Sequence, residues 1–136
     1  MQVLIDTNVL LDFLLEREPF QQDAAKLFEA IESGQIIGHI TATTLTDIFY
    51  IARKHTHSLE LTREAVSNAL DTMNICSVNR SVLESAFASG LTDFEDAVQI
   101  YSAIAQSLDA IATRDAKGFV SSSIPVYAVQ ELLEKL

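Results

Sequence analysis

The chain has 136 residues, of which 49% are hydrophobic and 21% are charged. This composition is typical of a globular domain and excludes a disordered or low-complexity protein, and no apolar run reaches the roughly 18–20 residues of a membrane-spanning helix. Nine basic residues against nineteen acidic ones give a net charge of −10, so the chain as a whole does not attract nucleic acid or anionic lipid.

The cysteine content and the first residues indicate the compartment. Cys76 is the only cysteine, which excludes a disulfide framework and a cysteine-based zinc site. The segment Met1–Ile5 lacks the basic start and the long apolar stretch of a secretion signal. We therefore expect a cytoplasmic protein that does not associate with membranes.

Short apolar runs alternate with longer amphipathic segments along the whole chain. Apolar runs of this length predict strands, and apolar residues at a spacing of three or four predict helices. In chain order, the predicted strands are Val3–Ile5, Ile36–Ile40, Met73–Val78, Ala110–Thr113 and Pro125–Val129. The predicted helices are marked by Phe20–Ile31, Leu45–Ala52, Leu61–Leu70, Val82–Ala88, Asp93–Ser107 and the residues after the last strand.

This alternation predicts the fold class. Strands that are linked by helical crossovers pair in parallel, and the helices cover both faces of the sheet. We expect an α/β protein, a three-layer α/β/α sandwich with a central parallel sheet of about five strands, in a single domain over residues 1–136. Ligands of such sheets bind at the carboxyl ends of the strands, where the strand order reverses.

Two aspartates lie just after predicted strands. Asp6 follows the first strand and Asp115 follows the fourth, so both lie at the same edge of the predicted sheet. Each also has an ordinary structural interpretation, Asp6 as a helix N-cap and Asp115 as a turn residue. Their common edge favours a functional role for both.

The segment Thr92–Asp96 is the most informative stretch of the chain. Thr92 and Glu95 fit a capping box, and Asp93 suits the positive end of the helix dipole. Asp96 has no such structural role, because at about 100° per residue it begins the helix stripe that continues into the apolar core. A carboxylate at that place is costly unless it is protonated or bound to a cation.

The remaining polar candidates are weaker. Asp47 lies opposite an apolar helix face, and an exposed helix position explains it as well as a functional site does. His55 and His57 are two residues apart and cannot share one helix face. His39 lies in a predicted strand, and Cys76 fits a small core residue.

Aspartates that converge on one sheet edge repel each other, and a divalent cation relieves this repulsion. Mg²⁺ and Mn²⁺ prefer oxygen ligands. Such an ion lowers the pKa of a bound water and holds phosphate oxygens, so hydrolysis of a phosphodiester needs no histidine base. The sequence therefore favours metal-dependent phosphodiester hydrolysis.

Four segments together resemble the PIN-domain family of metal-dependent ribonucleases: Val3–Leu10, Thr44–Ile48, Asp93–Ala97 and Ala112–Asp115. They occur in order and span nearly the whole chain. The resemblance implies an acidic metal pocket with Asp93 at its edge, built from Asp6, Asp47, Asp96 and Asp115. It also implies hydrogen-bonding support from Thr7, Asn8 and Thr113.

Small stand-alone members of this family are often toxins of VapBC-type toxin–antitoxin pairs. The resemblance therefore implies an RNA substrate, Mg²⁺ or Mn²⁺ as cofactor, a homodimer, and silencing by an antitoxin protein. Two positions depart from the family pattern. The second acid is commonly Glu, where this chain has Asp47, and Gly118 stands where relatives with a similar ending often carry an acid before the residue that matches Phe119.

Four basic residues lie close in sequence to Asp47 or Asp115: Arg53, Lys54, Arg114 and Lys117. We expect Arg114 and Lys117 to bind the phosphate backbone of the substrate. For Arg53 and Lys54, scattered solvated charges are an equally good explanation.

Two other families of phosphate-handling enzyme are disfavoured by missing residues, and a third alternative stays open. Haloacid-dehalogenase-like phosphatases carry a second aspartate where this chain has Asn8. Response-regulator receivers place an aspartate after the third strand and a lysine after the fifth, but Val78–Arg80 and Val129-Gln130 stand there. The third alternative is a non-catalytic PIN-like module that binds metal or mediates dimerisation.

Overall fold

The computed structural model describes residues 1–136 and contains five strands, seven α-helices and one short 3-10 helix. The strands are β1 (Gln2–Ile5), β2 (Ile37–Thr41), β3 (Asn74–Cys76), β4 (Ala110–Ala112) and β5 (Val126–Tyr127). The helices are α1 (Thr7–Leu14), α2 (Gln21–Glu32), α3 (Ala42–Thr56), α4 (Leu59–Thr72), α5 (Arg80–Ala88), α6 (Phe94–Ala105), α7 (Val129–Glu134) and the 3-10 helix η1 (Ala116–Phe119).

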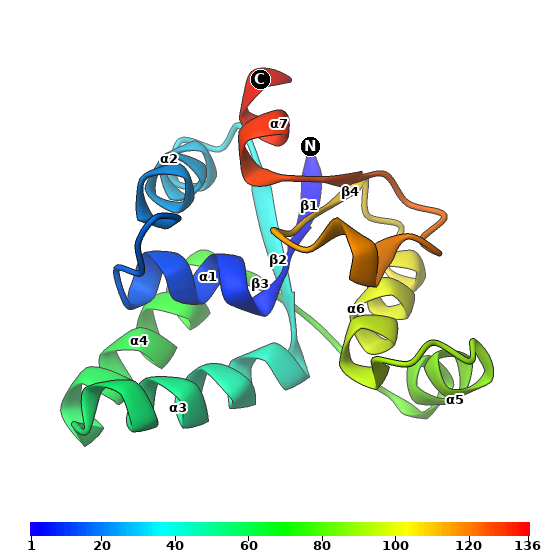
Figure 1. Cartoon of the computed structure of the whole chain (residues 1–136), viewed down its shortest axis with the longest axis horizontal. Coiled ribbons are helices and arrows are strands. Elements are labelled where there is room, and N and C mark those ends of the chain that lie inside the picture. Colours follow the sequence, from blue (N-terminus) through cyan, green and yellow to red (C-terminus); the bar gives the residue numbers. More distant parts are fainter.

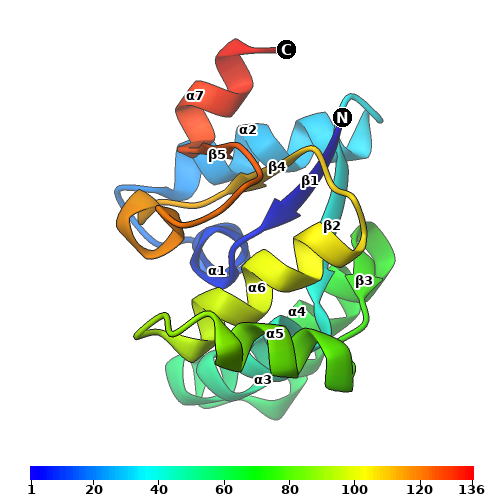
Figure 2. The ribbon, with the colours of Figure 1, turned by 90° about the vertical axis from the view of Figure 1, so that its right-hand side faces the viewer.

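The five strands form one parallel sheet in the order β3-β2-β1-β4-β5. The strand order reverses between β1 and β4, because the chain first builds outward to β3 and then returns to the other side of β1. Helices α1–α4 and α7 cover one face of the sheet, and α5, α6 and η1 cover the other (Figures 1 and 2). The predicted three-layer α/β/α fold is confirmed.

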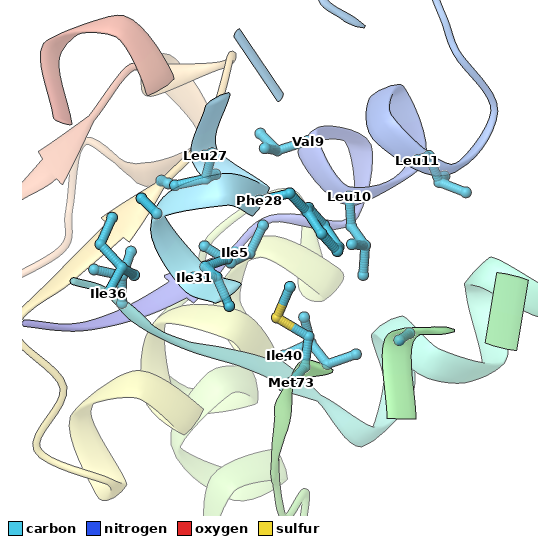
Figure 3. Packing of buried hydrophobic residues seen from close by; sticks show 14 of the residues in the cluster. Ile5, Val9, Leu10, Leu11, Leu27, Phe28, Ile31, Ile36, Ile40 and Met73 are labelled. Carbon is cyan, nitrogen blue, oxygen red and sulfur yellow. The ribbon is translucent and has the colours of Figure 1, made fainter. Parts of the chain in front are cut away.

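The sheet is buried on both faces, which explains why its strands are continuous apolar runs. In β1, Val3 and Ile5 pack into the larger core under α1, α2 and α3, while Leu4 points to the opposite core under α6. In Figure 3, Phe28 and Ile31 of α2 lie in the larger core beside residues from α1 and β2.

Several predicted boundaries differ from the structure. The strands β3 and β5 are shorter than the predicted runs, because β3 pairs with β2 only over Asn74–Cys76 and β5 pairs with β4 only over two residues. Helix α6 begins and ends inside the predicted range Asp93–Ser107. None of the helices combines the length and the apolar character that crossing a lipid bilayer requires.

The predicted capping box at the start of α6 is wrong. Asp93 is the N-cap, and its side chain accepts a hydrogen bond of 3.0 Å from the backbone N–H of Asp96. Glu95 is therefore the second residue of the helix rather than the third, the position from which a capping-box carboxylate reaches back. Thr92 precedes the N-cap residue, and the Glu95 carboxylate is not used to cap the helix.

Candidate functional site

An acidic pocket of about 300 Å³ lies at the carboxyl edge of the sheet, next to the point where the strand order reverses. The starts of α1, α3 and α6 gather there, below the sheet in Figure 1. Six of its nine lining residues carry a carboxylate, and Ile51 is the one hydrophobic residue. The pocket is lined by Asp6, Thr7, Asn8, Asp47, Ile51, Asp93, Glu95, Asp96 and Asp115.

The structure brings together all five aspartates that the sequence singled out. Asp6 follows β1 directly, Asp47 comes from the first half of α3, and Asp115 lies three residues after β4. Asp93 and Asp96 come from the start of α6, and the next turn of that helix carries Ala97 and Ile100 into the core. Residues that are up to 109 positions apart therefore share one pocket.

Both carboxylate oxygens of Asp6 are held by buried hydrogen bonds. Thr113 donates its hydroxyl to Oδ2 at 2.7 Å, and Gln99 donates its Nε2 to Oδ1 at 3.0 Å. Asp6 occupies the N-cap position of α1, but its side chain makes no capping hydrogen bond, so the interpretation of this carboxylate as a helix cap is wrong. Asp6 is instead a buried acid with a fixed orientation.

Gln99 was not predicted from the sequence. It is buried, and its Oε1 atom has no hydrogen-bond partner. The signal that could have found it is its spacing, because Gln99 lies one helical turn after Asp96 on the stripe that enters the core. A polar side chain on such a stripe needs a partner inside the protein.

The hydroxyl of Thr7 links two walls of the pocket. It shares a buried hydrogen bond of 2.8 Å with the hydroxyl of Thr44, which in turn contacts the hydroxyl of Thr41 at 3.0 Å. This chain of hydroxyls ties the start of α1 to the start of α3. Asn8 contributes differently, since its backbone and side-chain oxygens accept hydrogen bonds from Arg17.

Two carboxyl groups in the pocket have strongly raised pKa values. Burial, followed by repulsion from the charges of Asp93, Asp6 and Asp115, raises the pKa of Asp96 to about 7. Burial also raises the pKa of Glu95 to about 7, with further contributions from a hydrogen bond to Asp47 and from the surrounding negative charges. Glu95 is the second pocket residue that sequence reasoning missed, because the expected capping box had assigned its carboxylate a structural role.

Gly118 allows the Asp96 carboxylate to lie against the backbone of η1. A Cβ atom at Gly118 would collide with Oδ2 of Asp96 and would lie 3.8 Å from Oδ2 of Asp115. A side chain at position 118, including the acid of some relatives, would therefore have to displace Asp96. The space that a side chain would take is filled by Asp96.

None of the four basic residues considered in the sequence lines the acidic pocket. The Arg114 guanidinium turns to the other side of its backbone, where Nε lies 3.1 Å from Asp12 and the group stacks over the Phe20 ring. Lys117 is exposed on η1, and Arg53 and Lys54 are exposed in the last turn of α3. The negative charges of the pocket are thus left without a basic partner.

The donor set of the pocket fits a hard divalent cation. As the side chains lie, no group of three or more acidic, histidine or cysteine side chains is placed so that it could enclose a metal ion. The pocket nevertheless supplies six carboxylates and no basic side chain. Burial and, after it, the charges of neighbouring carboxylates raise the pKa values of Asp96 and Glu95, and an oxygen-binding cation would neutralise these charges.

The chain matches known proteins over most of its length. A family model described as PIN domain matches residues 2–117. No curated protein sequence matches the chain.

Solved structures match with similar coverage. A toxin-antitoxin complex from Klebsiella pneumoniae is 25% identical, with a TM-score of 0.68, over 93% of this chain and 97% of that chain. VapC20 of Mycobacterium tuberculosis, a Sarcin-Ricin loop cleaving toxin, is 11% identical, with a TM-score of 0.73, over 88% and 94% of the two chains. VapBC-1 of nontypeable Haemophilus influenzae is 15% identical, with a TM-score of 0.69, over 96% and 99%.

Proposed function

The chain belongs to the PIN domain family, and from this premise we propose that it is a metal-dependent ribonuclease, the toxin of a toxin–antitoxin pair. A fold hosts many functions, so the site has to support this proposal. The observation that carries it is the convergence of Asp6, Asp96 and Asp115, with three further carboxylates, in one pocket at the switch point of the sheet.

In the proposed enzyme, Mg²⁺ or Mn²⁺ is held by Asp6, Asp47, Asp96 and Asp115, with Asp93 at the pocket edge. When bound, such an ion lowers the pKa of a water and stabilises charge on the phosphate oxygens. The chain's own residues set the orientation of the acids. Thr113 and Gln99 hold Asp6, and the backbone at Gly118 supports Asp96.

The proposed substrate and partners follow from the similar structures. VapC20 cleaves the Sarcin-Ricin loop, which supports RNA as the substrate of this chain. The matched proteins from Klebsiella and Haemophilus are a toxin-antitoxin complex and a VapBC pair, which supports an antitoxin as partner. We also propose a homodimer, which exposed apolar side chains such as Phe87 and Tyr50 support, and a cytoplasmic location, which suits a single free cysteine.

Contacts with the RNA backbone are proposed for Lys117 and Arg114. Lys117 is exposed two residues after Asp115, which lines the acidic pocket. Arg114 keeps its Nη groups for a ligand, because its pair with Asp12 uses Nε. These two cations are the basic groups nearest in sequence to Asp115.

Substitution of the central acids tests the proposal. We expect the wild type to cut single-stranded RNA with Mg²⁺ or Mn²⁺, and Asp6→Asn and Asp96→Asn to lose this cleavage while they stay folded. Asp71→Asn is the matched control, because Asp71 is an exposed acid on α4 away from the pocket. RNA cleavage by gel assay and folding by circular dichroism are the measurements.

Absence of metal-dependent cleavage of any RNA by the wild type would contradict the ribonuclease. It would favour the alternative, a non-catalytic PIN-like module that binds metal or mediates dimerisation. Calorimetric titration with Mn²⁺ then distinguishes a metal-binding module from one that only dimerises.

A further inference from the structure

A second pocket, of about 210 Å³, lies between α1, α2 and the start of α7. Its polar and aromatic walls are Asp12 of α1, Phe20 and Asp23 at the start of α2, Arg114 after β4, and Gln130 at the start of α7. We call it the side pocket. Its volume is below the roughly 300 Å³ at which pockets for drug-sized ligands begin, so it suits a single small ring system.

The side pocket and the acidic pocket are lined by adjacent residues of the same two backbone segments. Asn8 lines the acidic pocket and Val9 the side pocket, and in the same way Asp115 lines the first and Arg114 the second. Consecutive Cα atoms are about 3.8 Å apart. A polymer whose phosphate lies in the acidic pocket therefore has the side pocket within reach of a neighbouring group.

The chemistry of the side pocket suits a flat, polar ring. The Arg114 guanidinium lies 4.1 Å from the centre of the Phe20 ring, and 38% of Phe20 is exposed. Nucleobases of single-stranded RNA stack on aromatic rings and on guanidinium planes. Asp23 and Gln130 add a hydrogen-bond acceptor and an amide beside this platform, which fits the polar edge of a base.

Buried contacts fix this platform before any ligand binds. Asp12 is 1% exposed and pairs with Arg114 at 3.1 Å and with Arg17 at 2.9 Å. Arg17 in turn donates to the backbone and side-chain oxygens of Asn8, which lines the acidic pocket. Asp23 on the pocket wall offsets the surplus charge of the two guanidinium groups, so the side pocket lacks the strong negative charge of the acidic pocket.

We propose that the side pocket binds one nucleobase of the RNA, in the nucleotide next to the phosphate that is cut. This inference rests on the proposed ribonuclease function and deepens it, because it makes Phe20 and Arg114 the groups that select the position of cleavage. The RNA is favoured over a protein partner as the occupant because the pocket is small, has the Arg114–Phe20 stack as one wall, and shares two backbone segments with the acidic pocket.

The experiment pairs a side-chain truncation with removal of single bases. Cleavage is measured for the wild type and Phe20→Ala with one RNA, intact or with an abasic nucleotide at each position around the cleaved bond. At one position, the missing base should raise KM about tenfold for the wild type and leave kcat unchanged. The same missing base should cost Phe20→Ala no more than about twofold, because the stacking partner is already absent.

Affinity measurements separate this inference from the ribonuclease proposal. Fluorescence anisotropy of the same RNAs in an Asp96→Asn background gives the same comparison without cleavage. Gln130→Ala is a second variant in case Phe20→Ala is poorly folded, and Leu70→Ala is the control, since Leu70 is an exposed apolar residue on α4 that lines neither pocket. If each missing base weakens RNA binding equally with and without the Phe20 side chain, the nucleobase site is overturned, whether or not RNA is cut. The side pocket would then be left to a side chain of a protein partner.

Discussion

Gln99 holds Asp6 through its amide nitrogen, while its amide oxygen has no hydrogen-bond partner. Its Nε2 donates to Oδ1 of Asp6, but its Oε1 is buried without a partner. An unpartnered buried polar atom costs about 1–3 kcal/mol. Such a cost in the core indicates that the orientation of Asp6 is the reason for the glutamine.

Gln99→Met tests this role. The substitution removes the donor to Asp6 and the unpartnered oxygen together, so we expect the free energy of unfolding to stay within about 1 kcal/mol of the wild type. RNA cleavage should fall about 10- to 100-fold, the usual loss when the group that orients a metal ligand is removed. Urea unfolding and steady-state cleavage are the measurements.

Ser102→Ala is the control for Gln99→Met. It removes the other unpartnered buried oxygen, one turn further along α6 and away from Asp6. This variant should keep full cleavage with equal or higher stability. Full cleavage by Gln99→Met would contradict the positioning role.

A site residue could be predicted where the feature that marks it lies within a few residues of it in the sequence. Asp6 and Asp115 were identified because they lie within a few residues of strand ends, and a strand end is visible in the pattern. Glu95 was missed because Thr92 and Asp93 are both good N-cap residues. With Asp93 as the cap, Glu95 is the second helical residue, and its carboxylate is not used in a capping box. Gln99 was missed because its partner is 93 positions away.

At the scale of elements, helix α1 is fixed to its surroundings by one buried acid. Burial raises the pKa of Asp12, whereas the charges of Arg114 and Arg17 oppose this effect. The carboxylate connects α1 to the loop before α2 and to the segment after β4. It therefore aligns both walls that the acidic pocket and the side pocket share.

Asp12→Asn should lower the free energy of unfolding by about 3 kcal/mol or more, because removal of one partner from a buried ion pair leaves the other charges uncompensated. Chemical denaturation measures this loss. Asp71→Asn, the same change at an exposed site, should stay within about 0.5 kcal/mol of the wild type. Similar stabilities for both variants would show that Asp12 has no structural role.

The arrangement of elements was predicted better than their ends or the directions of their side chains. Alternating apolar runs and amphipathic segments determine a parallel three-layer fold. The ends of β3 depend on how many residues of β2 face it. Arg114 was expected beside Asp115, but a buried acid on α1 holds its guanidinium away from the acidic pocket.

At the scale of the whole molecule, the acidic pocket makes stability depend on pH. The pKa values of Asp96 and Glu95 are about 7 in the folded chain, against ordinary values of 3.8 and 4.5. The folded state therefore binds more protons than the unfolded state between these limits. The resulting destabilisation is absent below about pH 4 and is fully present above about pH 7.

Without metal, we expect the contribution of the pocket to the melting temperature to fall as the pH rises from 4 to 8. Asp96→Asn should flatten this profile, because the amide has no charge to repel. Mn²⁺ should raise the melting temperature of the wild type more at high than at low pH, since its ligands have to lose their protons. Differential scanning calorimetry with EDTA or Mn²⁺ measures both effects, and a wild-type profile parallel to that of Asp96→Asn would contradict the prediction.

The walls of the acidic pocket come from both ends and the middle of the chain, and the last of them is Asp115. During translation, the acidic pocket therefore cannot form in an early fragment, and the proposed ribonuclease site is complete only after Asp115 has left the ribosome. Helices α1–α4, by contrast, are complete by residue 72. The helices of the larger core can therefore fold before the proposed ribonuclease site is complete.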